Sequence, residues 1–185
     1  LVYASPNHVD ATLDAMERHI RNGPMVGLKL WVCRRCNDPA YDPIIQYAVE
    51  LGVPLQQHTW IKSTGNLETE STPRDLLEVA RRHPRAQFVM AHSGGNWEKG
   101  IRIVADQPNI AVDLCGGDPE AGQTEYAVAL LGAERVLFGS DAAGRSFASQ
   151  LGKVTAAELT DVHRMLILAG NATRLFALES RAGDS

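Results

Sequence analysis

Three side chains that could bind a metal ion follow short apolar runs in the sequence. His58 closes the run PLQQH, His92 closes FVMAH, and Asp141 follows VLFGS. Imidazole nitrogens and carboxylate oxygens are standard ligands of zinc and similar divalent ions, and such an ion lowers the pKa of a bound water to about 7. We therefore expect His58 and Asp141 to bind a metal ion. We expect His92 to orient the water or to polarise a substrate carbonyl.

This chemistry requires the ends of the apolar runs to meet in space. In a (β/α)8 barrel the C-terminal ends of all strands converge on one face, which holds the active site. In an open doubly wound sheet the strand ends form a row, and His58 and Asp141 could lie far apart. An ordinary interpretation also exists, because a single histidine at a strand end is commonly a structural residue.

Other polar and aromatic side chains follow the same runs. Arg34 and Arg35 follow GLKLW, separated from it by two residues. They would therefore lie on the face formed by the C-terminal ends of the strands, where they could pair with a substrate carboxylate in bidentate fashion. Arg145 is a second candidate for binding an anion. Trp60 and Trp31 are candidates for the wall of a substrate pocket, with ordinary core packing as the equal alternative.

Lysine and cysteine residues carry weaker predictions. Lys29 lies in the middle of GLKLW, where burial requires a partner for its charge, so we expect a salt-bridged lysine near the site. Cys33 and Cys36 have the spacing of half a zinc site, but the sequence has only one other cysteine, Cys115, which favours chance spacing. Three cysteines are too few for a disulfide scaffold and indicate reduced thiols in a cytoplasmic protein.

Six short apolar runs alternate with helix-like segments, which is the pattern of βα units and a parallel sheet. Runs such as FVMA and VLFG lack polar alternation, which indicates strands buried on both faces. The expected strands are 1–4, 25–31, 54–57, 87–91, 109–114 and 135–139. The expected helices are 8–22, 43–51, 73–83, 97–106, 123–131, 156–168 and 172–178.

Several helix starts are marked by polar residues that can cap free backbone N–H groups. Asp42 and Thr72 each precede a proline, which places a cap residue ahead of the preferred first helical residue. Thr155 and Glu158 have the spacing of a capping box. The last pair predicts a helix that begins at residue 156.

Chain length limits the choice of architecture. Dividing 185 residues among six βα units gives about 31 residues each, close to the usual ~30. An eight-unit barrel needs about 250 residues, so a barrel here would be partial, and a doubly wound six-stranded sheet is the alternative. No linker divides the chain, so we expect a single domain over residues 1–185. No glycine-rich phosphate loop follows a strand, which argues against a nucleotide-binding domain.

Composition argues against two classes of partner. The chain has 18 Lys and Arg against 22 Asp and Glu, a net charge of −4, and 44% hydrophobic residues, which is typical of a globular domain. No basic cluster is present to bind nucleic acid or a membrane surface, and no apolar run approaches the ~18 residues of a spanning helix. We expect a small-molecule substrate, with pairing into a homo-oligomer as a further option at the open strand edges of a partial barrel.

Taken in order, six stretches resemble the metal-dependent hydrolases of the amidohydrolase 2 type: GLKLW, PLQQHTW, FVMAHSGGNWEKGI, IAVDLCG, RVLFGSDA and LILAGNATRLF. The resemblance implies a TIM-barrel fold in which the six runs are strands three to eight. It implies that His58 matches the metal ligand of strand five, His92 the histidine of strand six, and Asp141 the strand-eight aspartate that binds metal and moves a proton. It further implies one divalent ion, with zinc as the first choice, and a relation to a set of decarboxylases.

One feature departs from that family. Such enzymes open with an HxH pair on strand one, and no H-x-H occurs in this sequence. The loss of two ligands would weaken or abolish metal binding by this chain. The leading hypothesis is a hydrolase that uses metal-activated water on a small polar or carboxylate-bearing substrate. The alternatives are a metal-dependent non-oxidative decarboxylase on the same scaffold and a catalytically inactive barrel fragment.

Overall fold

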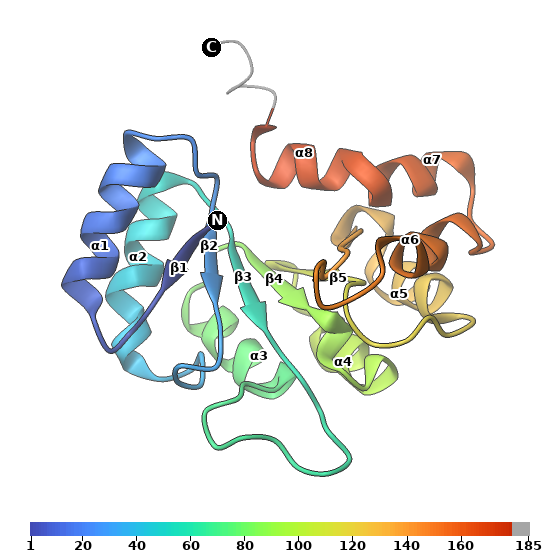
Figure 1. Cartoon of the computed structure of the whole chain (residues 1–185), viewed down its shortest axis with the longest axis horizontal. Coiled ribbons are helices and arrows are strands. Elements are labelled where there is room, and N and C mark those ends of the chain that lie inside the picture. Colours follow the sequence, from blue (N-terminus) through green and yellow to red (C-terminus); the bar gives the residue numbers. More distant parts are fainter. Residues whose placement is uncertain (179–185) are drawn as a thin grey trace.

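The computed structural model describes residues 1–178, and within them six parallel strands form a sheet in which each strand pairs with the next along the chain (Figure 1). The strands are β1 (Val2–Ala4), β2 (Leu28–Leu30), β3 (Leu55–His58), β4 (Phe88–Ala91), β5 (Ile110–Asp113) and β6 (Val136–Leu137). A doubly wound sheet would reverse its strand order partway, whereas a barrel wall runs in sequence. The order β1 to β6 therefore confirms the prediction of an α/β fold of partial TIM-barrel type, and all six expected runs form strands.

Helices connect the strands and pack beside one another in chain order (Figure 1). The α-helices are α1 (Val9–Met16), α2 (Asp42–Leu51), α3 (Pro73–Arg82), α4 (Trp97–Val104), α5 (Gln123–Leu131), α6 (Phe147–Thr155), α7 (Asp161–Met165) and α8 (Asn171–Leu175). Two π-helical segments, η1 (Glu17–Arg21) and η5 (Leu166–Gly170), extend α1 and join α7 to α8. Short 3-10 turns occur at η2 (Pro39–Tyr41), η3 (His92–Gly94) and η4 (Ala133–Arg135).

The two faces of the sheet differ in polarity because alternate residues of a strand point to opposite sides. Leu28, Leu30 and Leu55 are at most 1% exposed and belong to the hydrophobic core. Burying one such leucine contributes about 1.5–3 kcal/mol. Lys29 pairs in register with Gln56, and both are only partly buried. The second face therefore carries polar side chains, and in a closed barrel this face would be the interior.

The helix caps agree with the sequence in α3 and differ from it in α2 and near the C-terminus. Asp42, expected as the cap of α2, is instead its first residue, and no side chain caps this helix. Thr72 is the cap of α3 as expected, and it forms a capping box with Asp75. The capping box expected at Thr155 is wrong, because α6 ends at this residue and its hydroxyl donates to the Leu151 carbonyl at 3.2 Å. The cap of the following helix is Thr160, whose side chain accepts from the N–H of His163. The helix expected over residues 156–168 is thus shorter: residues 156–160 form a connection after α6, and α7 with η5 follows.

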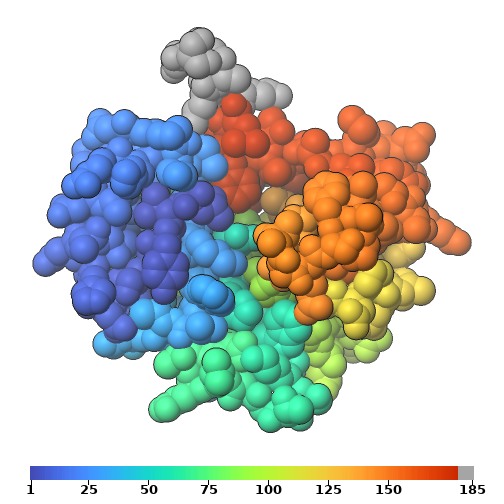
Figure 2. All heavy atoms as spheres, viewed as in Figure 1, coloured from blue at the N-terminus to red at the C-terminus, as the bar shows by residue number. Residues whose placement is uncertain are grey.

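The C-terminal helices cover the outer side of β6. Among residues 1–178, β1 and β6 each lack a strand partner on one side. Directly after β6, the N–H of Phe138 donates to the carbonyl of Ile167 in η5 at 2.8 Å. Phe176, which follows α8, lies close to the start of β2, because a methyl group placed on Gly27 would lie 3.3 Å from its ring. Figure 2 shows the C-terminal helices, in red, next to the blue N-terminal part. These helices therefore reach from one outer strand toward the other.

The helices of residues 1–178 are short. None is both long enough and apolar enough to cross a bilayer.

Candidate active site

Two histidines meet where β3 and β4 end. His58 is the last residue of β3 and pairs in register with Ala91, so His92 follows beside it. Nε2 of His92 lies 3.0 Å from Nδ1 of His58, and the two rings meet edge to face. The side chain of His58 is 13% exposed and His92 is 8% exposed. The structure thus brings together two of the three side chains singled out from the sequence.

A buried carboxylate binds the other nitrogen of His58. Oε1 of Glu70 lies 2.9 Å from Nε2 of His58, and Oε2 lies 2.7 Å from Nζ of Lys62. Oε2 also accepts from Nδ2 of Asn66 at 3.2 Å and from the N–H of Leu67 at 3.3 Å. Only 3% of the Glu70 side chain is exposed. Glu70 lies in a connection without helix or strand, so neither periodicity nor a motif marks it in the sequence.

The carboxylate of Asp113 fixes the backbone conformation at His92. His92 and Ser93 have left-handed backbones with φ of 64° and 50°, which side chains other than glycine rarely adopt. Oδ1 of Asp113, which is 2% exposed, accepts from the N–H of His92 at 3.1 Å and from the N–H of Cys115 at 3.0 Å. Oδ2 accepts from Nε2 of Gln56 at 2.7 Å. Three segments are therefore tied together at one carboxylate.

Burial controls the protonation of the histidine pair. It lowers the pKa of His58, although the hydrogen bond to Glu70 acts in the opposite direction. It also lowers the pKa of His92, against the effect of the Asp113 carboxylate. Burial raises the pKa of the Cys115 thiol, whose Sγ lies 3.2 Å from Nδ1 of His92. Both imidazoles and the thiol are therefore neutral near neutral pH.

Asp141, the expected metal ligand and proton acceptor, lies exposed in the loop after β6, where its φ is 50°. Its carboxylate is one of the charges that act on His92, in the direction that opposes the effect of burial. Over residues 1–178, no three His, Cys, Asp or Glu side chains are grouped so that they could hold a metal ion. The structure therefore does not assemble His58 and Asp141 into a complete metal site.

Trp60, expected to line a substrate pocket, lies against both histidines. Its ring centroid is 5.2 Å from that of His92, and it stacks on His58 at 6.1 Å. A methyl group on Gly95 would lie 2.6 Å from the Trp60 ring, so this close approach requires glycine. Trp60 borders a polar hollow of about 450 Å³, whose other walls include Lys62, Ser63, Asn96, Trp97 and Glu120. A small molecule in this hollow would therefore lie next to the residue that packs on the histidine pair.

Of the three arginines expected to bind a substrate anion, Arg34 and Arg35 lie away from the histidine pair, in a hollow of their own. Nε of Arg34 donates to Oδ1 of Asn7 at 2.6 Å, and Nη1 donates to Oδ2 of Asp38 at 3.1 Å. Arg34 lines a separate hollow of about 690 Å³ that contains neither histidine. Arg145 is exposed in the loop that carries Asp141, and its N–H donates to the Asp141 carbonyl at 3.0 Å. The structure thus places Trp60 at the histidine pair, but not Arg34.

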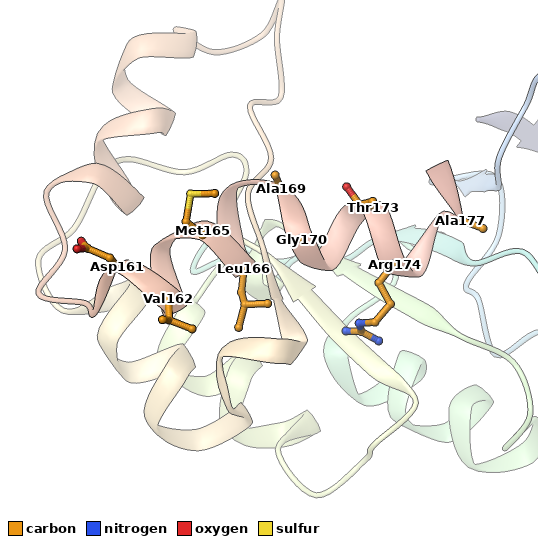
Figure 3. A pocket seen from close by; sticks show the side chains of 9 residues that line it. All are labelled: Asp161, Val162, Met165, Leu166, Ala169, Gly170, Thr173, Arg174 and Ala177. Carbon is orange, nitrogen blue, oxygen red and sulfur yellow. The ribbon is translucent and has the colours of Figure 1, made fainter. Parts of the chain in front are cut away.

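A larger, mainly apolar hollow of about 930 Å³ lies along α7, η5 and α8 (Figure 3). Its lining includes Asp161, Val162, Met165, Leu166, Thr173 and Arg174. None of the side chains expected to do chemistry borders it, so it is separate from the candidate active site.

Comparison with protein families gives one match over most of the chain. A family model described as Amidohydrolase matches residues 1–178. A search of curated proteins finds no match. The family match covers every strand and helix described above.

Comparison with solved structures finds proteins of similar fold. A TIM-barrel protein from Bordetella bronchiseptica, itself uncharacterised, has a TM-score of 0.76 at 19% identity, covering 98% of this chain and 66% of that chain. A 2,6-dihydroxybenzoate decarboxylase from Rhizobium has a TM-score of 0.71 at 17% identity, covering 94% and 68%. A 5-carboxyvanillate decarboxylase from Novosphingobium aromaticivorans, complexed with manganese and 4-hydroxy-3-methoxy-5-nitrobenzoic acid, has a TM-score of 0.70 at 16% identity, covering 94% and 62%. The chain thus spans about two thirds of the length of these structures.

Proposed function

Because this chain belongs to the amidohydrolase family, we propose that it is a metal-dependent hydrolase acting on a small polar or carboxylate-bearing substrate. The observation that carries the proposal is the contact between His58 and His92 at the C-terminal ends of two neighbouring parallel strands. In barrels of this type, that end of the strands holds the active site. Trp60 and the adjoining polar hollow supply a place for a small molecule beside the pair.

The metal ion belongs to the same proposal. His58 and Asp141 offer the imidazole and carboxylate donors that divalent ions bind, so the donor set fits in kind, but the described residues supply only part of a coordination shell. A bound divalent ion would supply Lewis-acid activation of water or of a substrate carbonyl. Zinc is the ion expected from the sequence, and manganese is the ion bound by the similar 5-carboxyvanillate decarboxylase.

The protein's own groups perform proton transfer and binding. His92 is neutral near neutral pH because it is buried, so it can take or give a proton at a substrate atom. Asp141 would accept the proton of the attacking water, and its exposed position leaves it open to solvent and substrate. Trp60 would form the pocket wall, and Arg145 a contact to a substrate carboxylate. Arg34 is not part of the proposed substrate site, because its guanidinium already forms hydrogen bonds with Asn7 and Asp38.

Decarboxylation is the second candidate reaction. The observation that favours it is that two of the structures similar in fold are decarboxylases of aromatic acids. On this scaffold, His92 or Asp141 would deliver a proton to carbon in place of the lost carboxylate. The same pocket would then bind an aromatic acid. For either reaction we propose a cytoplasmic location, because the three cysteines are free thiols and suit a reducing compartment.

Product analysis separates these reactions. The purified chain is incubated with zinc or manganese in ¹⁸O-labelled water, together with amides, esters and aromatic carboxylic acids. Incorporation of ¹⁸O into the carboxylic acid product indicates hydrolysis, whereas release of carbon dioxide with no ¹⁸O in the organic product indicates decarboxylation. We expect His92→Gln to lower turnover about 10²- to 10⁴-fold. The matched control is His19→Gln, on the exposed surface of η1. Folded, metal-supplemented protein that turns over none of these compounds would instead support the inactive-fragment hypothesis.

A further inference from the structure

Glu70 is a buried carboxylate to which the proposed reaction assigns no role. Its Oε2 accepts from three donors, on Lys62, Asn66 and Leu67. The salt bridge to Lys62 and these hydrogen bonds favour the ionised form. An ionised carboxylate can only accept hydrogen bonds. The remaining oxygen, Oε1, faces Nε2 of His58 at 2.9 Å, so this ring nitrogen has to carry the hydrogen.

The proton position on His58 then determines the one on His92. A neutral imidazole has one N–H and one lone pair, so Nδ1 of His58 becomes an acceptor. Nε2 of His92, 3.0 Å away, must therefore be the donor, because two facing lone pairs would repel each other. Nδ1 of His92 is left as an acceptor for the thiol of Cys115 at 3.2 Å. Each ring nitrogen of the two histidines has a partner in this arrangement, and the Cys115 carbonyl, 3.3 Å from Nδ1 of His92, is a neighbouring acceptor that receives no hydrogen from the ring.

We propose that Glu70 is a positioning residue that fixes the hydrogen of His58 on Nε2 and, through His58, the hydrogen of His92 on Nε2. The arrangement leaves the lone pair of His58 on Nδ1, where it accepts the hydrogen of His92 Nε2. Histidines that bind metals commonly donate their other N–H to a carboxylate in this way, which fixes the ring and raises its basicity. The inference concerns proton positions in the folded chain and holds whichever reaction the chain catalyses.

The connection between β3 and α3 is built to hold Glu70 in place. Nδ2 of Asn66 donates to the carbonyl of Trp60 at 2.6 Å, and Oδ1 of Asn66 accepts from the N–H of Lys62 at 3.1 Å. The N–H of Glu70 donates to the carbonyl of Leu67 at 3.0 Å. The carboxylate is therefore fixed by the folding of its own loop as well as by His58.

Glu70→Gln gives a sharp test, because the orientation of the new amide is determined by its surroundings. The three donors at Oε2 require the amide oxygen at that position, which places the amide NH₂ opposite Nε2 of His58. An amide N–H there needs a lone pair on Nε2, so the hydrogen of His58 should move to Nδ1. His92 should then carry its hydrogen on Nδ1, where the carbonyl of Cys115 at 3.3 Å can accept it. We expect this single substitution to exchange the protonated nitrogen in both rings.

Nitrogen NMR of the ¹⁵N-labelled full chain measures this directly, because a ring nitrogen that carries a hydrogen and one that does not have widely separated shifts. The spectra are recorded without metal at about pH 8, above the ordinary histidine pKa of about 6.5. His58→Gln and His92→Gln assign the signals. Glu68→Gln is the matched control, because Glu68 lies in the same connection with an exposed side chain.

In the wild-type chain we expect the hydrogen on Nε2 of both His58 and His92, in Glu70→Gln on Nδ1 of both, and in Glu68→Gln on Nε2 as in wild type. A wild-type spectrum with the hydrogen on Nδ1 of His58 overturns the proposal, and this result does not require the Glu70 variant to fold. A folded Glu70→Gln chain with unchanged proton positions overturns it as well. Because the readout requires neither metal nor substrate, it is separate from the test of the proposed function.

Discussion

Asp113 is the side chain whose removal would most directly disturb the candidate active site. Asp113→Ala leaves the buried N–H groups of His92 and Cys115 without an acceptor, and each buried unsatisfied group costs about 1–3 kcal/mol. We expect a loss of about 2–5 kcal/mol in the free energy of unfolding, measured by urea denaturation. Asp113→Asn keeps one carbonyl oxygen for both donors and should lose much less. Equal losses in the two variants would contradict this role.

The histidine pair makes stability depend on pH in a definite direction. Burial holds the folded pKa values of His58 and His92 below the ordinary value of about 6.5, so the unfolded chain binds more protons between the two values. The free energy of unfolding should therefore fall as pH drops below about 6.5. It should level off once the folded-state pKa values are passed. The slope is at most about 1.4 kcal/mol per pH unit for each histidine.

Urea denaturation from about pH 8 to about pH 5 checks this dependence on either side of the ordinary histidine pKa. The double variant His58→Gln with His92→Gln should have a flatter profile than the wild type. Glu70 does not contribute to the pH dependence in this range, because its pKa lies below its ordinary value. Burial raises the pKa of Glu70, but the hydrogen bonds from Lys62 and His58 lower it more. Its contribution is lost only at more acidic pH, below about 4.3. An unchanged slope in the double variant would show that other groups set the pH dependence.

Among the elements, the end of α4 and the start of β5 are joined by one arginine. The guanidinium of Arg135 donates to four backbone carbonyls, those of Val104, Ala105, Gln107 and Ile110, at 2.7–3.1 Å. Lysine has no planar fork and cannot reach four acceptors. We expect Arg135→Lys to lower the free energy of unfolding by about 2–4 kcal/mol in urea denaturation. Arg81→Lys on the exposed face of α3 should have almost no effect, and equal effects would contradict the role of Arg135.

The elements that sequence patterns predicted are those whose buried positions are apolar. All six strands were found for this reason, although β2 and β6 are shorter than expected. Helix α6 was missed because its buried positions include Gln150 and Lys153, which interrupt the apolar periodicity. Glu70 was missed for a related reason, because its burial depends on partners such as His58 that only the fold places beside it. The meeting of His58 and His92 could be expected, since both follow neighbouring parallel strands.

At the scale of the molecule, one hydrophobic core connects the first strand with the last helices. Its buried members extend from Val2 in β1 through all six strands to Ile167 in η5. A continuous core of this kind favours cooperative unfolding. We therefore propose that the chain is a single domain and expect one transition in urea. The three tryptophans all precede α5, so fluorescence reports on the N-terminal part while far-UV circular dichroism reports on all helices.

Ile167→Ala tests whether the C-terminal helices belong to this cooperative unit. Ile167 is fully buried, so its truncation should lower the free energy of unfolding by about 2–5 kcal/mol. If the helices and the sheet unfold together, fluorescence and circular dichroism should shift by the same amount and still coincide. Val162→Ala, 68% exposed on α7, should change stability by at most about 0.5 kcal/mol. Circular dichroism that changes at lower urea than fluorescence would show that the C-terminal helices unfold separately. In that case the side of β6 beside Phe138 would lose its cover while the histidine pair stayed folded.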